Sequence, residues 1–497
     1  KPTVSVSDKT LMDLNANRIN LKINEWNFLN NKLKLDVQNV LINGLNGKVT
    51  AAKNPNKKKP NYSGIQLPLK IKNIDLKNSN LTIDNLDKPL VFNDLTAKIE
   101  NLEMNEKTVR EKIPFKTENY RLTTKNFSFK INQFYQINIG ALTQNKNALL
   151  VSNFSLKPLV SRAQFIRMIP AEKDLYDLKI NQISAKGNWD LASESKFLDA
   201  SQVTLNGMNA NIFRSKIPKD DLTEKPLYSK LLRTIKFPMF IQNLDVRNSV
   251  LVYEEDTKKS DGPGKLTFNN FSLNAKNLNS GKMKGKPTLV PISINCRFMN
   301  ASPMKVKWSF DTANMNDAFA ISGNIADLPA AEINSFIEPY LKIRATGLIS
   351  DLIFNFRGNF SGIHGTLKMV HQNLQVAVLK PTGEKNKILS AVANMVVKTN
   401  SGNYPESVSV ENVDRDKTKS FFNLFWRGIE QGLKKTLIGK NAPTTEVKVK
   451  NAVEVTKSTL KQTKKDIAET KSDVKQKVQD TKEKVKEKGI FRNIFKK

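Results

Sequence analysis

Few side chains in this chain of 497 residues are of the types that carry acid–base, nucleophilic or metal chemistry. Its two histidines, His364 and His371, cannot complete a zinc-protease motif or a catalytic triad, and we interpret both as histidines on the surface of a sheet. The single cysteine, Cys296, excludes an internal disulfide framework and a multi-cysteine metal site. Its context, PISINCRF, predicts a small apolar side chain within a strand.

Nucleotide-binding and carboxylate motifs are equally scarce. The sequence contains neither a Walker loop nor GxGxxG, and Asp75 and Asp245 occupy the turn-like contexts NIDLKNS and NLDVRNS. In such contexts we expect the carboxylates to bond backbone amides rather than to catalyse. The sequence therefore predicts no catalytic residue, no metal and no cofactor, and an enzyme such as a glycan-processing β protein would need a cleft of paired carboxylates that the sequence does not reveal.

The two aspartates belong to a stretch that occurs twice, at residues 67–102 and 237–278. An element before each copy repeats as well, VLINGLN from Val40 answering VTLNGMN from Val203. Such agreement indicates an internal duplication. The identical pairs in the first part of the stretch are Pro68/Pro238, Ile71/Ile241, Asn73/Asn243, Asp75/Asp245, Asn78/Asn248, Ser79/Ser249 and Leu81/Leu251.

Alternating apolar and polar residues, punctuated by Asn, Asp, Ser and Gly, predict many short half-buried strands. We expect a mainly β fold, an elongated, curved and repetitive sheet that forms a groove, with short helices at 161–176, 225–238 and 329–341. The predicted segments are a first unit (1–198), a second unit (199–287), a C-terminal β module (288–402), a linker with an amphipathic helix (403–445) and a Lys/Glu-rich helical or disordered tail (446–497).

Two C-terminal segments have the composition of membrane-interface helices. Residues 420–439 place bulky apolar side chains on one helical stripe with basic residues beside it, and the terminal GIFRNIFKK forms a second small apolar face. The alternative for residues 420–439 is a helix that covers the end of the sheet with the same stripe. The membrane-interface candidates are Phe422, Phe425, Trp426, Ile429, Leu433, Leu437, Ile490, Phe491, Ile494 and Phe495.

A formal net charge of +33 calls for an anionic partner or a well-solvated lysine surface. Nucleic-acid grooves pair clustered arginines with stacking aromatics, whereas the bases here are mostly lysines scattered along strands, so we expect no nucleic acid. An anionic membrane surface fits better. No window approaches about 18 consecutive apolar residues, so the sequence predicts no transmembrane helix within it.

Three segments together resemble AsmA-like proteins of the bacterial envelope. They are SKIPKDDLTEKPLYSKLLRTIKFPMFIQNLDVRNSVLVYEE, LKIRATGLISDLIFNFRGNFSGIHGTLKMVHQNLQVAVL and FFNLFWRGIEQGLKKTLIG. The resemblance implies an N-terminal membrane helix, a long curved sheet with a hydrophobic groove, and phospholipid transport between membranes in support of the outer membrane. It implies a place in the periplasm of the bacterial envelope, with anchoring to the inner membrane if an N-terminal helix is missing from this chain. The membrane helix does not occur in this sequence, which begins at Lys1 and leaves anchoring open.

The apolar face of such a sheet must be buried against another layer, by closure, or against a lipophilic ligand. We therefore expect phospholipid or another acyl lipid as the ligand, with envelope protein partners unknown. The alternative is a membrane-tethered structural or assembly factor whose sheet interior is packed solid. The candidate groove residues are Ile71, Leu81, Ile83, Ile241, Leu251, Leu352, Phe354, Phe356 and Phe360.

Overall fold

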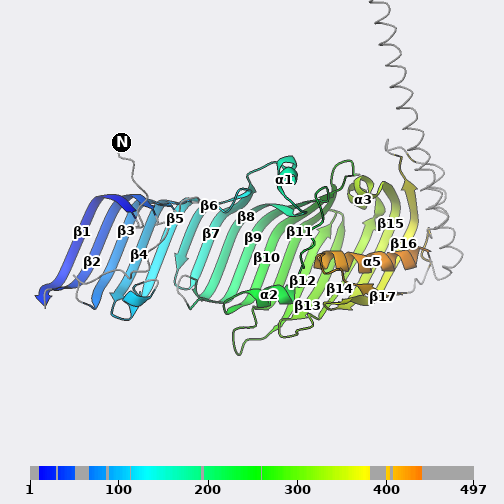
Figure 1. The fold of residues 1–497 in the computed structure, drawn as a ribbon. Coiled ribbons are helices and arrows are strands. Elements are labelled where there is room, and N and C mark those ends of the chain that lie inside the picture. The colour runs from blue at the N-terminus through cyan, green and yellow to red at the C-terminus, as the bar shows by residue number, and fades with distance from the viewer. Residues whose placement is uncertain are drawn as a thin grey trace, which may run out of the picture.

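The computed structural model describes residues 11–29, 32–50, 67–84, 89–111, 114–191, 195–258, 260–380, 385, 399–402 and 407–438. These residues form one open sheet of 17 strands with short helices beside it, which confirms the mainly β class (Figure 1). The residues of the Lys/Glu-rich tail, 446–497, lie outside the described ranges, as do Ile490, Phe491, Ile494 and Phe495.

The strands follow one another across the sheet in chain order (Figure 1). The first nine are β1 (Leu11–Leu29), β2 (Lys32–Thr50), β3 (Leu69–Asp84), β4 (Leu90–Met104), β5 (Asn119–Lys130), β6 (Tyr135–Asn145), β7 (Ala148–Pro158), β8 (Asp174–Asp190) and β9 (Phe197–Ser215). The others are β10 (Met239–Asp256), β11 (Gly264–Asn279), β12 (Leu289–Phe298), β13 (Ser302–Asp311), β14 (Phe319–Pro329), β15 (Ile343–Gly358), β16 (Gly362–Val378) and β17 (Val408–Asp414).

Two strand pairs are parallel, β2 with β3 and β9 with β10, while the other neighbouring pairs run antiparallel. Parallel neighbours need a longer connection than a hairpin, and the β9–β10 connection contains α2 (Tyr228–Thr234). We call these two parallel pairings the parallel joints. In each, the second strand, β3 or β10, begins one copy of the repeated stretch. The duplication seen in the sequence is thus a duplication of this joint and of the hairpin that follows it.

The repeated dipeptide Asn-Ser has one structural role in both copies. Asn78 and Asn248 are left-handed, with φ of 49° and 51°, and each begins a shift in the register with the following strand. The next residue, Ser79 or Ser249, is fully buried. The Ser249 hydroxyl accepts the Met208 N–H at 3.0 Å and donates to the Arg247 carbonyl at 2.7 Å. Asparagine tolerates the left-handed region, and serine satisfies the backbone that the irregularity leaves unpaired.

The strand that precedes each Asn-Ser pair, β2 or β9, contains a glycine that is also left-handed. Gly44 and Gly207 have φ of 65° and 67°, and a Cβ on either would lie within 2.4 Å of the side chain of Asn17 or Asn181 on the neighbouring strand. Only glycine suits that backbone at no steric cost. The sequence pattern Asn-Gly followed by Asn-Ser therefore encodes one line of irregularities that crosses the parallel joint.

Short helices lie beside the sheet. They are α1 (Arg162–Met168), α2, α3 (Asn334–Leu341) and α5 (Phe421–Ile438), with short 3₁₀ turns at Thr108–Arg110 and Ala330–Ile333. Ser161 caps α1 with a reciprocal capping box to Gln164, which confirms the expected start of that helix. The helix expected to reach Tyr176 ends at Met168, directly before Ile169 and the helix-breaking Pro170, and Asp174 to Tyr176 belong to β8 instead.

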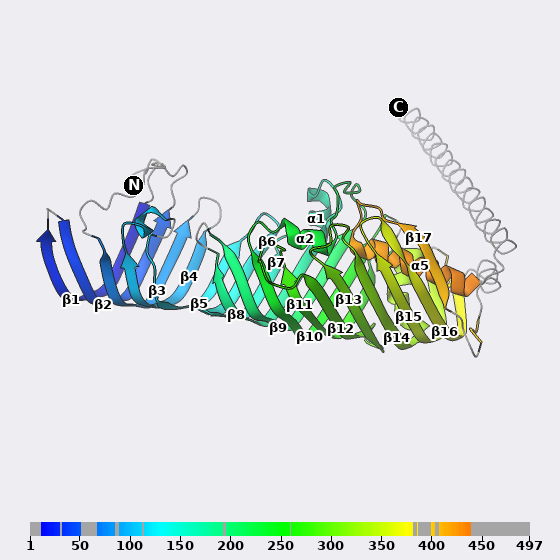
Figure 2. The same ribbon diagram turned by 90° about the horizontal axis from the view of Figure 1, so that it is seen from below.

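We define the inner face as the face of the sheet on which α5 packs. Leu424 and Ile429 of α5 belong to one cluster of buried residues with Phe356 and Leu367 of the sheet. Leu227, at the start of α2, belongs to the same cluster, and Figure 2 shows both helices on the same side. The main hydrophobic core therefore lies between the C-terminal strands and α5.

Candidate functional site

In the second unit, the inner face is apolar and partly covered. Leu244 packs against the cluster beneath α5, and Val246 forms a smaller cluster with Phe271 and Cys296, against which Leu251 packs. Both clusters are contacted by Leu273, Ile294 and Met304, so they lie on one face. Ile241 is paired with Leu278, which also contacts the larger cluster. The candidates Ile241 and Leu251 are therefore half-buried inner-face residues.

The first unit repeats this arrangement with the same spacing. Ile71 is opposite Leu102, Leu81 opposite Phe92, and Ile83 opposite Leu90, as Ile241, Leu251 and Tyr253 are opposite Leu278, Phe268 and Leu266. Ile71, Leu81 and Ile83 are each only half buried. All three predicted residues lie on β3, with Leu81 and Ile83 near its end and Ile71 ten positions before Leu81, and their matching register places them on the inner face.

The two halves of the inner face differ in what covers them. Among the described residues, every cluster of buried hydrophobic side chains is built from positions beyond Val160, with only Phe134, Tyr135 and Val160 packed at the margin of one of them. The strands β1 to β4 contain buried apolar residues, such as Val37 and Leu95, but none of their described side chains belongs to a cluster with a second layer over the sheet. An apolar face of this kind is the usual mark of a binding surface.

At the C-terminal end, three groove candidates are instead core residues. Leu352, Phe354 and Phe356 are 9%, 2% and 0% exposed. The ring of Phe425 from α5 lies 5.1 Å from that of Phe354 and 6.1 Å from that of Phe356. For these residues the expectation of an open groove is wrong, because α5 supplies the second layer.

Phe360 does not share the face of the other three aromatic candidates. β15 ends at Gly358, so the alternation that put Phe360 in register with Phe356 stops before it. Its side chain is 39% exposed, and the Lys417 ammonium lies 5.8 Å from the centre of its ring. It is a loop residue in a cation–π contact.

The apolar stripe of α5 is directed at the sheet, as in the alternative left open by the sequence. Ile429 is 7% exposed, and Phe425, Leu433 and Leu437 pack against the main core. These four membrane-interface candidates are therefore covered. Phe422 and Trp426 differ from them, because they remain 58% and 48% exposed.

Side chains of α5 also occupy the edge of the last strand, β17. The Gln431 side chain accepts the Glu411 N–H and donates to the Glu411 carbonyl, both at 2.9 Å, and so imitates a neighbouring strand. The Lys435 ammonium donates to the Ser409 carbonyl at 3.0 Å, and the Arg427 guanidinium to the Asp414 carbonyl at 2.6 Å. This edge is short and its exposed backbone is partly paired.

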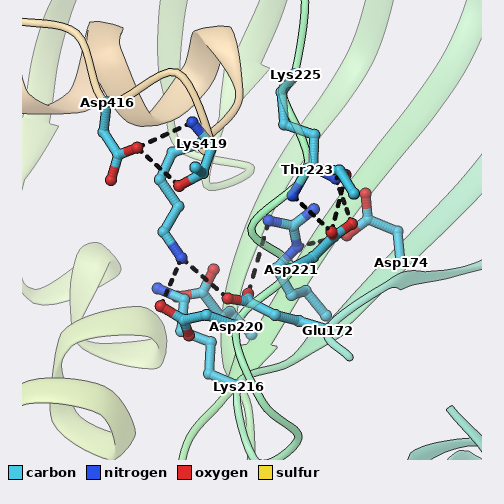
Figure 3. Close-up of polar contacts among 12 residues, drawn as sticks. Glu172, Asp174, Lys216, Asp220, Asp221, Thr223, Lys225, Asp416 and Lys419 are labelled. Carbon is cyan, nitrogen blue, oxygen red and sulfur yellow. Dashed lines mark hydrogen bonds and ion pairs between the residues drawn. The ribbon is translucent and has the colours of Figure 1, made fainter. Parts of the chain in front are cut away.

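A polar cluster holds the segment that leads into α5 (Figure 3). The Lys419 ammonium lies 3.0 Å from carboxylate oxygens of both Glu172 and Asp220. Lys419 holds the pKa of Asp220 below its usual range by hydrogen bonding to the ionised form. In the same cluster Arg214 pairs with Asp174 at 2.6 Å. Because opposite charges are matched, the cluster is suited to fastening connections together rather than to proton transfer.

Sequence reasoning missed this polar cluster. Lys419 and Glu172 are separated by 247 positions, and no local motif marks either residue. Asp245 likewise bonds side chains rather than the backbone amides that we expected, accepting from Asn274 at 2.7 Å and from Gln202 at 2.9 Å.

The histidines and the cysteine do not assemble into a site in the structure. His364 is exposed on β16, but His371 of the same strand is buried, so its assignment to the sheet surface is wrong. The Ser401 hydroxyl accepts the backbone N–H of His371 at 3.0 Å. Cys296 is buried in β12 as expected, and burial raises the pKa of its thiol to about 11. In the described ranges, no group of three or more His, Cys, Asp or Glu side chains is placed to hold a metal.

Within the described part of the chain, no helix is long and apolar enough to cross a membrane. Comparison with protein-family models finds no match for this chain, and comparison with curated proteins finds none either. The resemblance to AsmA-like proteins therefore stays a prediction.

Proposed function

We propose that the inner face of β1 to β4, over which the described residues form no second layer, is a groove that binds the acyl chains of phospholipid, and that the chain carries such lipids between membranes of the bacterial envelope without catalysing a reaction. The observation that carries the proposal is the contrast along one sheet. The same apolar face that α5 covers at Phe354 and Phe356 has no described layer over it at Leu81 and Ile83.

The energetics suit acyl chains. Burial of each methylene contributes about 0.8 kcal/mol, so a chain of ordinary length is held firmly yet can shift between equivalent positions. The inner-face residues repeat from strand to strand, Ile71 and Leu81 opposite Leu102 and Phe92, so neighbouring positions offer similar contacts. A row of similar apolar positions favours movement along the sheet over a single deep site.

The covered end sets the extent of the proposed path. Because α5 fills the inner face over the last strands, acyl chains are accommodated from β1 toward the second unit and not beneath α5. Phe422 and Trp426, which α5 leaves exposed, together with basic residues such as Arg427, are then the α5 side chains available to contact an anionic membrane surface.

A membrane-tethered structural factor is the second candidate. It is favoured by the C-terminal half, where Leu367, Phe356 and Leu424 form a dense core under α5. If the same packing were completed over the first unit by another element, the protein would bind no lipid. The two functions therefore differ in what occupies the inner face near Leu81.

Neighbouring residues of β3 provide a matched test. Leu81→Asp places a charge on the inner face, whereas Thr82→Asp places the same charge on the opposite face, since side chains alternate along a strand. Native mass spectrometry of the purified full chain, and transfer of a fluorescent phospholipid between vesicles, would be measured for both. We expect Leu81→Asp to lose bound phospholipid and most transfer, and Thr82→Asp to keep both.

Three results would count against the lipid proposal. They are the absence of phospholipid from the parent chain in both assays, equal loss in the two variants, and unfolding of Leu81→Asp alone. The last would indicate a packed core at this position, because burying an unpaired charge is costly. Phe354→Asp is unsuitable for this test, since Phe354 already lies in the core beneath α5.

A further inference from the structure

β1 is a long sheet edge whose protection among the described residues is limited to a few charged side chains, such as Arg18 and Lys22, and a register irregularity between Ile23 and Glu25. It pairs with β2 along one side over Leu11–Leu29, and among the described residues no strand pairs with its other side (Figure 1). It contains no proline, and it is much longer than β17, the strand at the opposite end. Natural sheets shorten, charge or cover such edges because unpaired backbone groups recruit other strands.

The exposed apolar side chains of β1 lie on the inner face. Ile23, Leu21 and Ile19 are opposite Val37, Val40 and Ile42 of β2, which in turn are opposite Ile71, Ile74 and Leu76 of β3. Ile74 and Leu76 occupy the positions that Leu244 and Val246 occupy in the second unit. The six large apolar residues of this edge are 42% to 69% exposed: Leu14, Ile19, Leu21, Ile23, Trp26 and Phe28.

The spacing of these residues is symmetric about Leu21. Ile19 and Ile23 lie two positions away on either side, and Leu14 and Phe28 seven positions away. Between them, Ala16 and Trp26 lie five positions away. An antiparallel pair of β1 strands centred on Leu21 would therefore place apolar inner-face residues opposite one another throughout.

The polar residues agree with the same register. Arg18 would be opposite Asn24, Lys22 opposite Asn20, and Glu25 opposite Asn17, so no two like charges are directly opposed. One irregularity of β1 agrees with this register. The pairing of β1 with β2 skips Asn17, and Asn17 would face Glu25 of the other copy, next to the register shift between Ile23 and Glu25.

We propose that β1 pairs antiparallel with β1 of a second copy of this chain, centred on Leu21, to give one continuous sheet. Such a pair is related by a two-fold axis perpendicular to the sheet, so the two inner faces join on the same side. The opposite edge cannot extend the assembly in the same way, because Gln431 and Lys435 of α5 already bond the backbone of β17. The assembly therefore closes as a dimer.

Disulfide trapping in the full chain tests the register directly. In the proposed pair, Leu21→Cys faces its own counterpart, and Ile19→Cys faces Ile23→Cys of the other copy. Directly opposed residues lie about 4.5–5.5 Å apart, within disulfide reach. Two copies of Ile19→Cys would be displaced by four residues, roughly 13 Å, which is too far.

We expect Leu21→Cys alone to form covalent dimers under mild oxidation, and a mixture of Ile19→Cys and Ile23→Cys to do so at least tenfold more than either variant alone. The parent chain is the control, because its one cysteine, Cys296, is buried. Equal trapping in all samples, or none, would overturn the proposal.

Solution mass and shape provide the second measurement. Sedimentation equilibrium should give twice the chain mass for the parent and the single-chain mass for Leu21→Lys, with unchanged circular dichroism because position 21 is 60% exposed. With strands about 4.8 Å apart, scattering should show a long dimension near twice that of the variant. A monomeric parent would refute the dimer whether or not phospholipid is bound, so this result is independent of the lipid proposal.

Discussion

The two glycines of α5 that face the sheet should respond in opposite directions to the same substitution. A Cβ on Gly428 would meet Ile363 Cγ2 and Phe356 Cε2 at 3.5 Å, an ordinary contact distance. A Cβ on Gly432 would lie 2.7 Å from Leu367 Cβ. Leu367 is fully buried, and its Cβ moves only with the strand, so the crowding cannot be relieved by a change of rotamer.

The expected magnitudes follow from these contacts. Replacing glycine by alanine inside a helix contributes about 1 kcal/mol of stability. Gly428→Ala should keep that gain, whereas Gly432→Ala should also incur an overpacking cost of about 1–3 kcal/mol. The two variants should thus differ by about 2 kcal/mol in the free energy of opening α5, a factor of roughly 30.

Hydrogen–deuterium exchange of the α5 amides measures this local opening without requiring the whole sheet to unfold in one step. Exchange should become slower in Gly428→Ala and faster in Gly432→Ala than in the parent. Equal rates in the two variants, or slower exchange in Gly432→Ala, would show that α5 does not approach the sheet as closely as the structure places it.

Two further predictions concern the line of irregularities and the polar outer surface. Ser249→Ala should destabilise β9 and β10 by about 1–3 kcal/mol, since the Met208 N–H loses its acceptor. Amide exchange in β9 and β10 should become faster in this variant but not in Ser201→Ala, the control at an exposed site. Hydrogen bonds from Asn274 and others outweigh burial and hold the pKa of Asp245 below its usual range. Asp245 therefore contributes stability above about pH 4 that is lost on further acidification, and Asp245→Asn should show a smaller fall in melting temperature between about pH 5 and pH 3. An equal fall in variant and parent would contradict the assignment.

The sequence was most informative where structure depends on near neighbours. Alternation predicted strands, although β1 and β9 are far longer than the short strands expected, with 19 residues each. The repeated Asn-Ser pairs marked corresponding positions in the two units, and Ser161 marked the start of α1. Such features depend on residues within a few positions of one another, or on comparison of one copy with the other. They could therefore be predicted without knowledge of the tertiary arrangement.

The covering of the inner face could not be predicted in this way. The stripe of α5 that contains Ile429 suits a membrane and a sheet equally, because both require an apolar surface at helical spacing. The sequence also shows no reason why Phe354 is enclosed while Leu81 is half exposed, since both lie in alternating strands. The difference depends on where α5 docks, which is fixed by distant contacts such as those of Lys419.

The two parallel joints have a consequence for the dimensions of the molecule. β2–β3 and β9–β10 are seven strands apart, and at about 4.8 Å between strands this interval corresponds to roughly 34 Å along the sheet. Because each joint restores the strand direction with which the unit began, a further copy could be inserted without reversing any later strand. The reach of such a protein would then grow in steps of about 34 Å, so duplication offers a simple way to match its length to the distance that it must bridge.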